Sequence, residues 1–174
     1  MTGDLPRSKR VTTRARRGER VVVNRQREVT VSPGLLGAFL TRACELVLPR
    51  AAGVAVCLVS DAEIARLNRT YRRKMGPTDV LSFPAAESNG GSGRVARTSE
   101  DAGPPPAATF HLGDIAISPA AARRNARRAG RSVPAELRVL MLHGVLHLAG
   151  YDHETDDGEM ERRERGLRHR LGIG

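Results

Sequence analysis

The chain has 174 residues, a formal net charge of +10 and a pI near 11.1. This length is typical of one domain that buries a substantial core, and so basic a chain favours a polyanionic partner over a membrane surface. We find no apolar run long enough to span a membrane and no apolar secretion signal behind the basic N-terminus. Cys44 and Cys57 are isolated, which favours reduced thiols and a cytoplasmic location.

Hydrophobic spacing and helix-capping residues predict nine elements between residues 20 and 171. In chain order they are strand 20–31, helix 35–48, strand 54–60, helix 61–73, strand 78–84, strand 110–118, helix 118–130, helix 134–150 and helix 156–171. This order predicts an α+β fold, in which a small mixed sheet of about four strands is covered by about five helices.

Two segments stand outside this pattern. Residues 1–19 are polar and basic without periodicity, which predicts a disordered N-terminal extension. Residues 85–109 are rich in Gly, Ser and Pro and lie between two predicted strands. This composition predicts a flexible insertion. The remainder, 20–174, is predicted to be a single catalytic domain.

The stretch HGVLHLAGYDH contains three of the chain's five histidines. His143 and His147 are four residues apart on a predicted helix, so both imidazoles project from one face. Gly150 then ends the helix and lets the chain return His153 towards the same point. Three imidazoles with one open position are typical of a catalytic zinc site, and we predict one zinc ion per chain at this helix end.

The alternative is that these histidines are buried and bonded to backbone carbonyls. Zinc helices of the H-E-x-x-H type carry a glutamate as general base, whereas this chain has Gly144 at that position. A glycine inside a helix suggests that a packing partner or a substrate approaches the backbone there. Asp152 is either a turn former or the partner of a ligand's second ring nitrogen.

HGVLHLAGYDH resembles the metal motif of the YbeY family, the bacterial endoribonucleases and rRNA maturation factors. The resemblance continues in LNRTYRRKMGPTDVLSFP at 67–84 and in LGDIAIS at 112–118, and it spans about residues 20–170 in the same order. It implies that His143, His147 and His153 bind zinc, and that Arg72 is the family's functional arginine. The extension and the insertion depart from the family's pattern.

Cleavage of a phosphodiester needs stabilisation of charge at phosphorus, which a metal ion and a guanidinium supply. We therefore predict Arg72 and His147 as catalytic residues, with Arg72 neutralising the scissile phosphate; a solvated cation at a helix end is the alternative. No general base is evident, and the nucleophile is either a metal-bound hydroxide or the RNA 2′-hydroxyl. Further substrate-binding candidates are Thr78, Asp79, Ser82 and Asp114.

A basic ridge is predicted on the helix at 118–130. Arg123, Arg127 and Arg131 recur every four residues, Arg124 and Arg128 lie beside them, and no acid lies between 115 and 135. Such a ridge is either a solvated face or a surface for RNA phosphates, and with few aromatic residues in the chain, backbone contacts are favoured over base stacking.

Together with the resemblance, these features predict a zinc-dependent endoribonuclease, and the resemblance implies that it is specific for single-stranded RNA. The resemblance implies a role in rRNA maturation, including the 3′ end of 16S rRNA, and in ribosome biogenesis and quality control. Its partners would be rRNA and the small ribosomal subunit or its proteins, with no membrane. Two alternatives remain: a metalloprotease-like zinc hydrolase, and a non-catalytic ribosome-assembly factor that contains zinc.

Overall fold

The computed structural model describes residues 18–49, 52–85, 110–152 and 157–173. The predicted basic extension and flexible insertion therefore fall almost wholly outside the described residues. The elements are β1 (Arg20–Asn24), α1 (Pro33–Val47), β2 (Ala52–Leu58), α2 (Asp61–Leu67), the π-helix η1 (Asn68–Arg72), β3 (Val80–Pro84), β4 (Phe110–Ile117), α3 (Pro119–Arg128), α4 (Val133–Leu148) and α5 (Glu159–Leu171).

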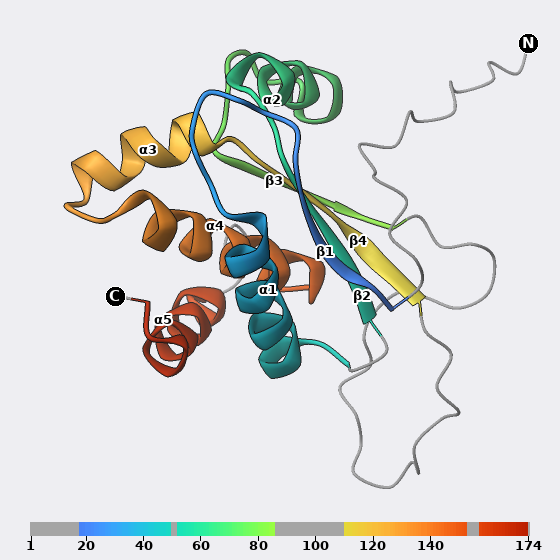
Figure 1. The fold of residues 1–174 in the computed structure, drawn as a ribbon. Helices are drawn as coiled ribbons and strands as arrows, with labels where there is room; N and C mark the ends of the chain where they lie inside the picture. The colour runs from blue at the N-terminus through green and yellow to red at the C-terminus, as the bar shows by residue number, and fades with distance from the viewer. Residues whose placement is uncertain (1–17, 50–51, 86–109, 153–156, 174) are drawn as a thin grey trace, which may run out of the picture.

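The strands form one mixed sheet in the order β1-β2-β4-β3 (Figure 1). β2 pairs in parallel with β1 and with β4, whereas β3 runs antiparallel to β4. β2 is buried along its whole length, as expected for an interior strand with a nearly continuous apolar sequence. The predicted α+β architecture is confirmed in the part of the chain that the structure describes.

Successive residues of β2 contribute to hydrophobic clusters on opposite faces of the sheet. Val54, Val56 and Leu58 join the larger cluster, to which α1, α4 and α5 contribute their apolar side chains. Cys57 joins a smaller cluster with Ile64 of α2 on the other face. α4 packs against α1, α3, α5, β3 and β4, so it is the central helix of the domain.

Serine side chains begin three of the helices, as the capping signals predict. The Oγ atoms of Ser60, Ser118 and Ser132 accept hydrogen bonds from backbone N–H groups three residues further on. No helix among the described residues combines the length and apolar character needed to cross a bilayer.

The first strand is shorter than predicted. β1 ends at Asn24, although β-branched residues continue to Val31. The buried Gln26 amide donates to the carbonyl of Val29 and accepts from its N–H, both at 2.9 Å. These bonds replace the pairing that a strand would need, and they turn the chain towards α1.

Candidate metal centre and nucleic-acid cleft

His143 and His147 lie near the C-terminal end of α4, one turn apart and on the same face. α4 ends where Gly150 adopts a φ of +91°, a conformation that favours glycine. Both imidazoles are partly exposed, although nearly every neighbouring position of the helix is buried. The most buried helix of the domain therefore presents two imidazoles at the surface.

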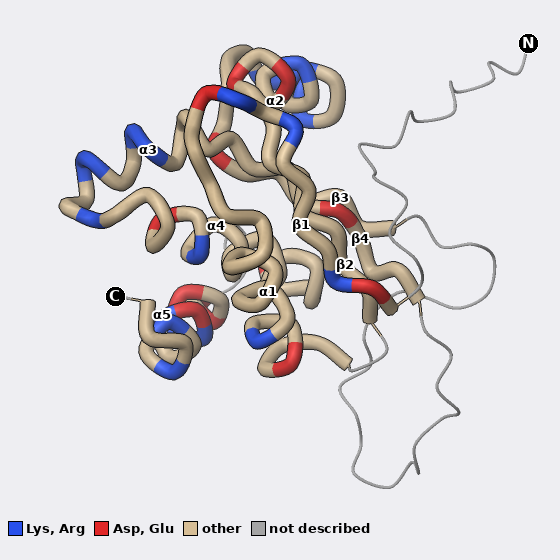
Figure 2. Tube along the Cα trace, viewed as in Figure 1, with Lys and Arg blue, Asp and Glu red and all other residues tan. Residues whose placement is uncertain are grey.

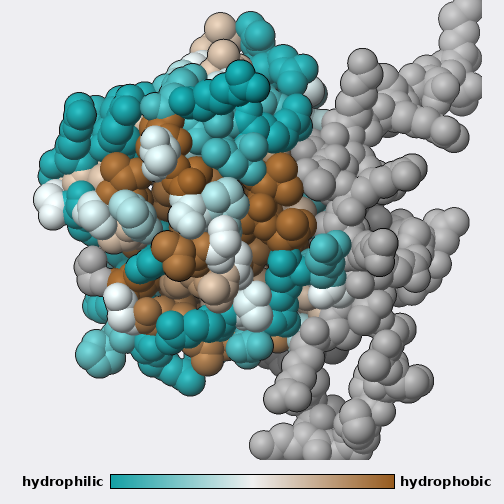
Figure 3. Space-filling model, in the orientation of Figure 1, coloured by the Kyte–Doolittle hydropathy of each residue, from teal (hydrophilic) through white to brown (hydrophobic). Residues whose placement is uncertain are grey.

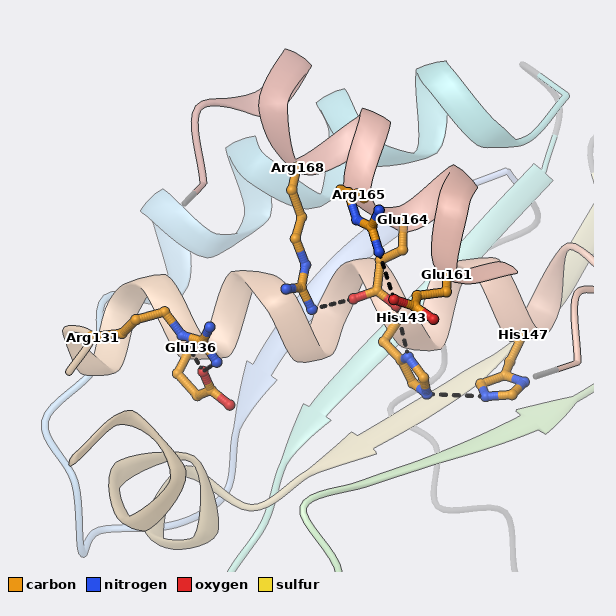
Figure 4. A network of polar contacts seen from close by, with 8 residues as sticks. All are labelled: Arg131, Glu136, His143, His147, Glu161, Glu164, Arg165 and Arg168. Carbon is orange, nitrogen blue, oxygen red and sulfur yellow. Dashed lines mark hydrogen bonds and ion pairs between the residues drawn. The ribbon is translucent and has the colours of Figure 1, made fainter. Parts of the chain in front are cut away.

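The two histidine rings face each other through their Nε2 atoms, which are 3.1 Å apart (Figure 4). The ring centroids are 4.7 Å apart and the planes are inclined by 78°. Two imidazole nitrogens bound to one tetrahedral zinc ion at about 2.0–2.1 Å are themselves about 3.3–3.4 Å apart. The pair is therefore close to the spacing that a shared metal ion requires, as well as being within hydrogen-bond distance.

Glu164 of α5 orients one of these rings. Its Oε2 lies 3.1 Å from Nδ1 of His143, so this nitrogen donates to the carboxylate and Nε2 is directed towards His147. Burial favours the neutral carboxyl group, but the hydrogen bond from His143 and the charge of Arg168 outweigh it and lower the pKa of Glu164 below its ordinary value. The carboxylate is therefore charged at neutral pH.

The sequence interpretation gave Glu164 no role, although a signal for it was present. The buried face of α5 is formed by Met160, Leu167 and Leu171, and Glu164 occupies the same face at helical spacing. A single carboxylate on the apolar face of a charged helix requires a buried partner. The sequence alone does not identify that partner, because His143 lies on a different helix.

A cavity of about 530 Å³ opens beside the two histidines. It is lined by Arg72, Thr78, Asp79, Val80, Leu81, Ser82, Pro84, His143, His147, Gly150, Tyr151 and Asp152. Most of the predicted site residues therefore line this cavity. They come from the end of η1, the segment before β3, β3 itself, and the C-terminal end of α4 with the residues that follow it. Asp114 is not part of this lining: its Oδ1 lies 2.9 Å from Nε2 of His111 on β4.

The polar residues before and within β3 help to shape the cavity wall. Oδ1 of Asp79 accepts from the N–H of Val80 at 2.9 Å and from the hydroxyl of Thr78 at 3.3 Å, as a turn-forming aspartate does. Ser82 donates to the carbonyl of Gly144 at 3.3 Å, which ties β3 to α4 beside the histidines. Both the structural and the substrate-facing interpretations of these residues are thus compatible with their positions.

Arg72 is the last residue of η1 and is exposed where it lines the cavity. The next residue, Arg73, has a φ of 55° and ends the helix. Tyr71 packs edge-on against Phe83 of β3, with ring centroids 5.1 Å apart, and this contact holds the segment against the sheet. A single π-turn is often found at functional sites, where it redirects side chains.

His153, the predicted third metal ligand, lies outside the described residues. Within the described part of the chain, no group of three or more His, Cys, Asp or Glu side chains is arranged to hold a metal ion. His143 and His147 do fit a metal ion by their spacing and by the fixed tautomer of His143.

Gly144 has a packing role. A Cβ atom at this position would lie 2.8 Å from Cγ2 and 2.9 Å from Cδ1 of Ile115, closer than real Cβ atoms approach. The glycine therefore lets α4 lie directly on β4. This contact explains the missing glutamate of the H-E-x-x-H pattern, because a larger side chain would separate the helix from the sheet.

The predicted basic ridge needs a correction. α3 ends at Arg128, so Arg131 does not extend the stripe formed by Arg123 and Arg127. Arg131 instead forms an ion pair of 2.6 Å with the buried Glu136 in the first turn of α4. The four-residue spacing alone placed Arg131 in the stripe, although the predicted helix already ended at residue 130.

An α+β domain with an imidazole pair suited to a metal ion and an arginine at the same cavity defines a candidate metal-dependent hydrolase. The sequence profile of the YbeY family, described as Endoribonuclease YbeY, matches residues 22–172. The chain belongs to this family.

Individual relatives agree with the family match. The Endoribonuclease YbeY of Koribacter versatilis is 41% identical over 157 residues, which covers 88% of this chain and 86% of the relative. The Solibacter usitatus protein of the same description is 44% identical over 116 residues, 67% of this chain and 64% of its own length. The solution structure of TM1509 from Thermotoga maritima is similar in fold, with a TM-score of 0.53 and 28% identity over 87% of this chain and 88% of that one.

Proposed function

We propose that the chain is a single-strand-specific, zinc-dependent endoribonuclease that acts in rRNA maturation, including the 3′ end of 16S rRNA, and in ribosome biogenesis and quality control. Membership of the YbeY family supports the endoribonuclease activity. The observation that carries the proposal is that His143, His147 and Arg72 line the same cavity.

His143 and His147 hold one zinc ion per chain, together with His153 beyond the Gly150 turn. The hydrogen bond between His143 and Glu164 supports this set, because it orients the ring so that Nε2 faces Nε2 of His147 at 3.1 Å. A zinc ion in this position stabilises negative charge on phosphate oxygens as a Lewis acid. Asp152 lies on the cavity wall, where it can accept a hydrogen bond from the second ring nitrogen of a ligand histidine.

Arg72 binds the scissile phosphate and stabilises its charge in the transition state. Its guanidinium can donate two parallel hydrogen bonds to a phosphate, and the described residues offer it no ion pair that would compete. Thr78 and Ser82 line the wall, where their hydroxyl oxygens accept hydrogen bonds from the substrate while their O–H groups donate to Asp79 and Gly144. Asp79 holds the turn between Arg72 and β3.

RNA also contacts the basic surface of α3, through Arg123 and Arg127. Both side chains are exposed on α3, and the arginines along this helix are visible in Figure 2. The space-filling view shows a hydrophilic surface at this end of the molecule (Figure 3). The small ribosomal subunit or its proteins, as the carrier of the rRNA, is the partner that this activity implies. The cytoplasm is the compartment supported by such a substrate and by the two unpaired, buried cysteines.

The decisive experiment combines elemental analysis with RNA cleavage. The purified protein is expected to contain one zinc ion, and to cut single-stranded RNA in a reaction that a chelator abolishes and added zinc restores. His143→Ala, His147→Ala and His153→Ala are each expected to lose most of the zinc, whereas exposed His169→Ala keeps it. Full zinc occupancy in His153→Ala would exclude the three-histidine site. A peptide substrate cleaved in place of RNA would support the metalloprotease alternative.

Arg72 variants test the role of the guanidinium. Arg72→Ala is expected to lower the cleavage rate by about 10²–10³-fold, as the loss of an oxyanion donor does. Arg72→Lys keeps the charge but lacks the two-pronged donor, so it recovers only part of that rate. Both variants keep zinc and wild-type stability, because Arg72 is exposed. The neighbouring Arg73→Ala serves as the control, and cleavage at the wild-type rate by Arg72→Ala would refute the assignment.

A further inference from the structure

A second hollow, of about 310 Å³, lies between α3 and the segment before β3. Pro77, Thr78 and Asp79 form one side of it, while α3 forms the other. Thr78 and Asp79 also line the cavity beside the histidines, so only this short segment separates the two spaces. A polymer that leaves the histidine cavity over Thr78 enters the second hollow directly.

The α3 side of this hollow consists of Ala121, Arg124, Asn125 and Arg128. Arg124 and Arg128 are one helical turn apart and therefore point to the same side of α3. In the predicted ridge they lie beside the stripe of Arg123 and Arg127. The fold turns this flanking pair towards the segment beside the histidine cavity.

The polar groups of the hollow are pre-arranged to different degrees. Arg124 pairs with Asp61 at 2.6 Å, which fixes its guanidinium at the rim. Asn125 donates to Oδ2 of Asp79 at 3.0 Å, and its amide group keeps a second N–H for a ligand. Arg128 is exposed, and its charge has no ion-pair partner in the described part of the chain.

The carboxylate of Asp79 is the one acidic group in the lining. Its Oδ1 accepts from Val80 and Thr78, while its Oδ2 accepts from Asn125. These bonds direct its lone pairs to protein donors and reduce its repulsion of an anion. Because Asp61 balances the charge of Arg124, Arg128 is the cation of this lining that remains available to an anion.

We propose that this hollow is a second phosphate subsite for single-stranded RNA, in which Arg128, helped by Asn125 and Arg124, binds the phosphate of a nucleotide flanking the cleavage site. The inference rests on the proposed function, because it extends the path of the same substrate. A flanking phosphate is the anion that a shared wall with the histidine cavity brings to this place. Arginine is suited to it, since the guanidinium matches the oxygens of a phosphate.

The test measures binding of a single-stranded 2′-O-methyl oligoribonucleotide as a function of salt. It compares the wild-type protein with Arg128→Ala and with Arg42→Ala, which removes one exposed arginine of α1 outside both hollows. Loss of one phosphate contact is expected to reduce the slope of log affinity against log salt by about 0.7. Arg128→Ala should show this reduction, whereas Arg42→Ala should keep the wild-type slope.

A second set of oligonucleotides replaces one phosphate at a time by a neutral methylphosphonate. With the wild-type protein, one flanking position should weaken binding and reduce the slope as Arg128→Ala does. With Arg128→Ala, the same replacement should cost nothing more, because both changes remove one contact. If every position costs the same in both proteins, or if Arg128→Ala behaves like Arg42→Ala while the wild type still cleaves RNA, the subsite is refuted and the proposed function stands. A wild-type protein that neither binds nor cuts RNA refutes both.

Discussion

Replacing Glu164 tests how α5 supports the proposed metal centre on α4. The side chain is 11% exposed, and its Oε2 holds Nδ1 of His143 at 3.1 Å. Glu164→Gln keeps an oxygen that can accept this hydrogen bond but removes the charge. Glu164→Ala removes both, and leaves the ring of His143 free to rotate or to exchange its tautomer.

The expected magnitude follows from the contact that is lost. A hydrogen bond to a charged group contributes about 1.5–3 kcal/mol, which corresponds to about a 10- to 150-fold change in an equilibrium constant. We therefore expect Glu164→Ala to weaken zinc binding by about 100-fold and Glu164→Gln by about 10-fold, in the range found for partners of metal-binding histidines. Arg168, which pairs with Glu164, is partly exposed and can turn to solvent in the variants.

The assay is a zinc titration against a chromogenic chelator, which requires no RNA. Glu161→Gln is the matched control, because Glu161 lies on the same helix but pairs with Arg165 at the surface, where both side chains are 75% exposed. It removes the same charge without touching His143. Thermal unfolding of the metal-free proteins shows whether the fold is intact. Equal zinc affinities for Glu164→Ala and Glu161→Gln, in folded proteins, would refute the role of Glu164.

Two further predictions concern packing and stability. Gly144→Ala is expected to cost about 1–3 kcal/mol through overpacking against Ile115, offset in part by about 1 kcal/mol of helix propensity. Urea unfolding should show the loss, and Ile115→Val, which removes Cδ1 but keeps Cγ2, should relieve only part of it. Arg131→Ala is expected to destabilise the fold by about 1–3 kcal/mol, because it leaves the buried Glu136 without its ion-pair partner. The salt dependence of RNA binding should stay unchanged. A smaller salt slope in a variant of wild-type stability would contradict this structural role.

The sequence was sufficient to predict the secondary structure and the position of the imidazole pair. Helix periodicity, serine caps and breaks at Gly and Pro depend on residues close together in the chain, and these signals placed every helix and strand within a few residues, apart from the end of β1. The four-residue spacing of His143 and His147 likewise fixes their common face as soon as α4 forms.

The tertiary structure decided how these elements combine, because the deciding contacts join residues far apart in the chain. Glu164 of α5 contacts His143 of α4. Ile115 of β4 lies so close to α4 that position 144 has room only for glycine. The sequence marks Glu164 as a carboxylate on an apolar helix face and Gly144 as a glycine within a helix. It does not identify the neighbour that either residue contacts, because that neighbour lies on another element.

The same reason separates the two sets of arginines. The sequence placed Arg123, Arg127 and Arg131 on one stripe because their spacing is helical, but spacing does not report where the helix stops or which acid approaches it. Only the fold brings Glu136 to Arg131, and only the fold turns Arg128 towards the segment beside the histidine cavity. Periodicity determines which residues share a face, whereas packing between elements determines what that face meets.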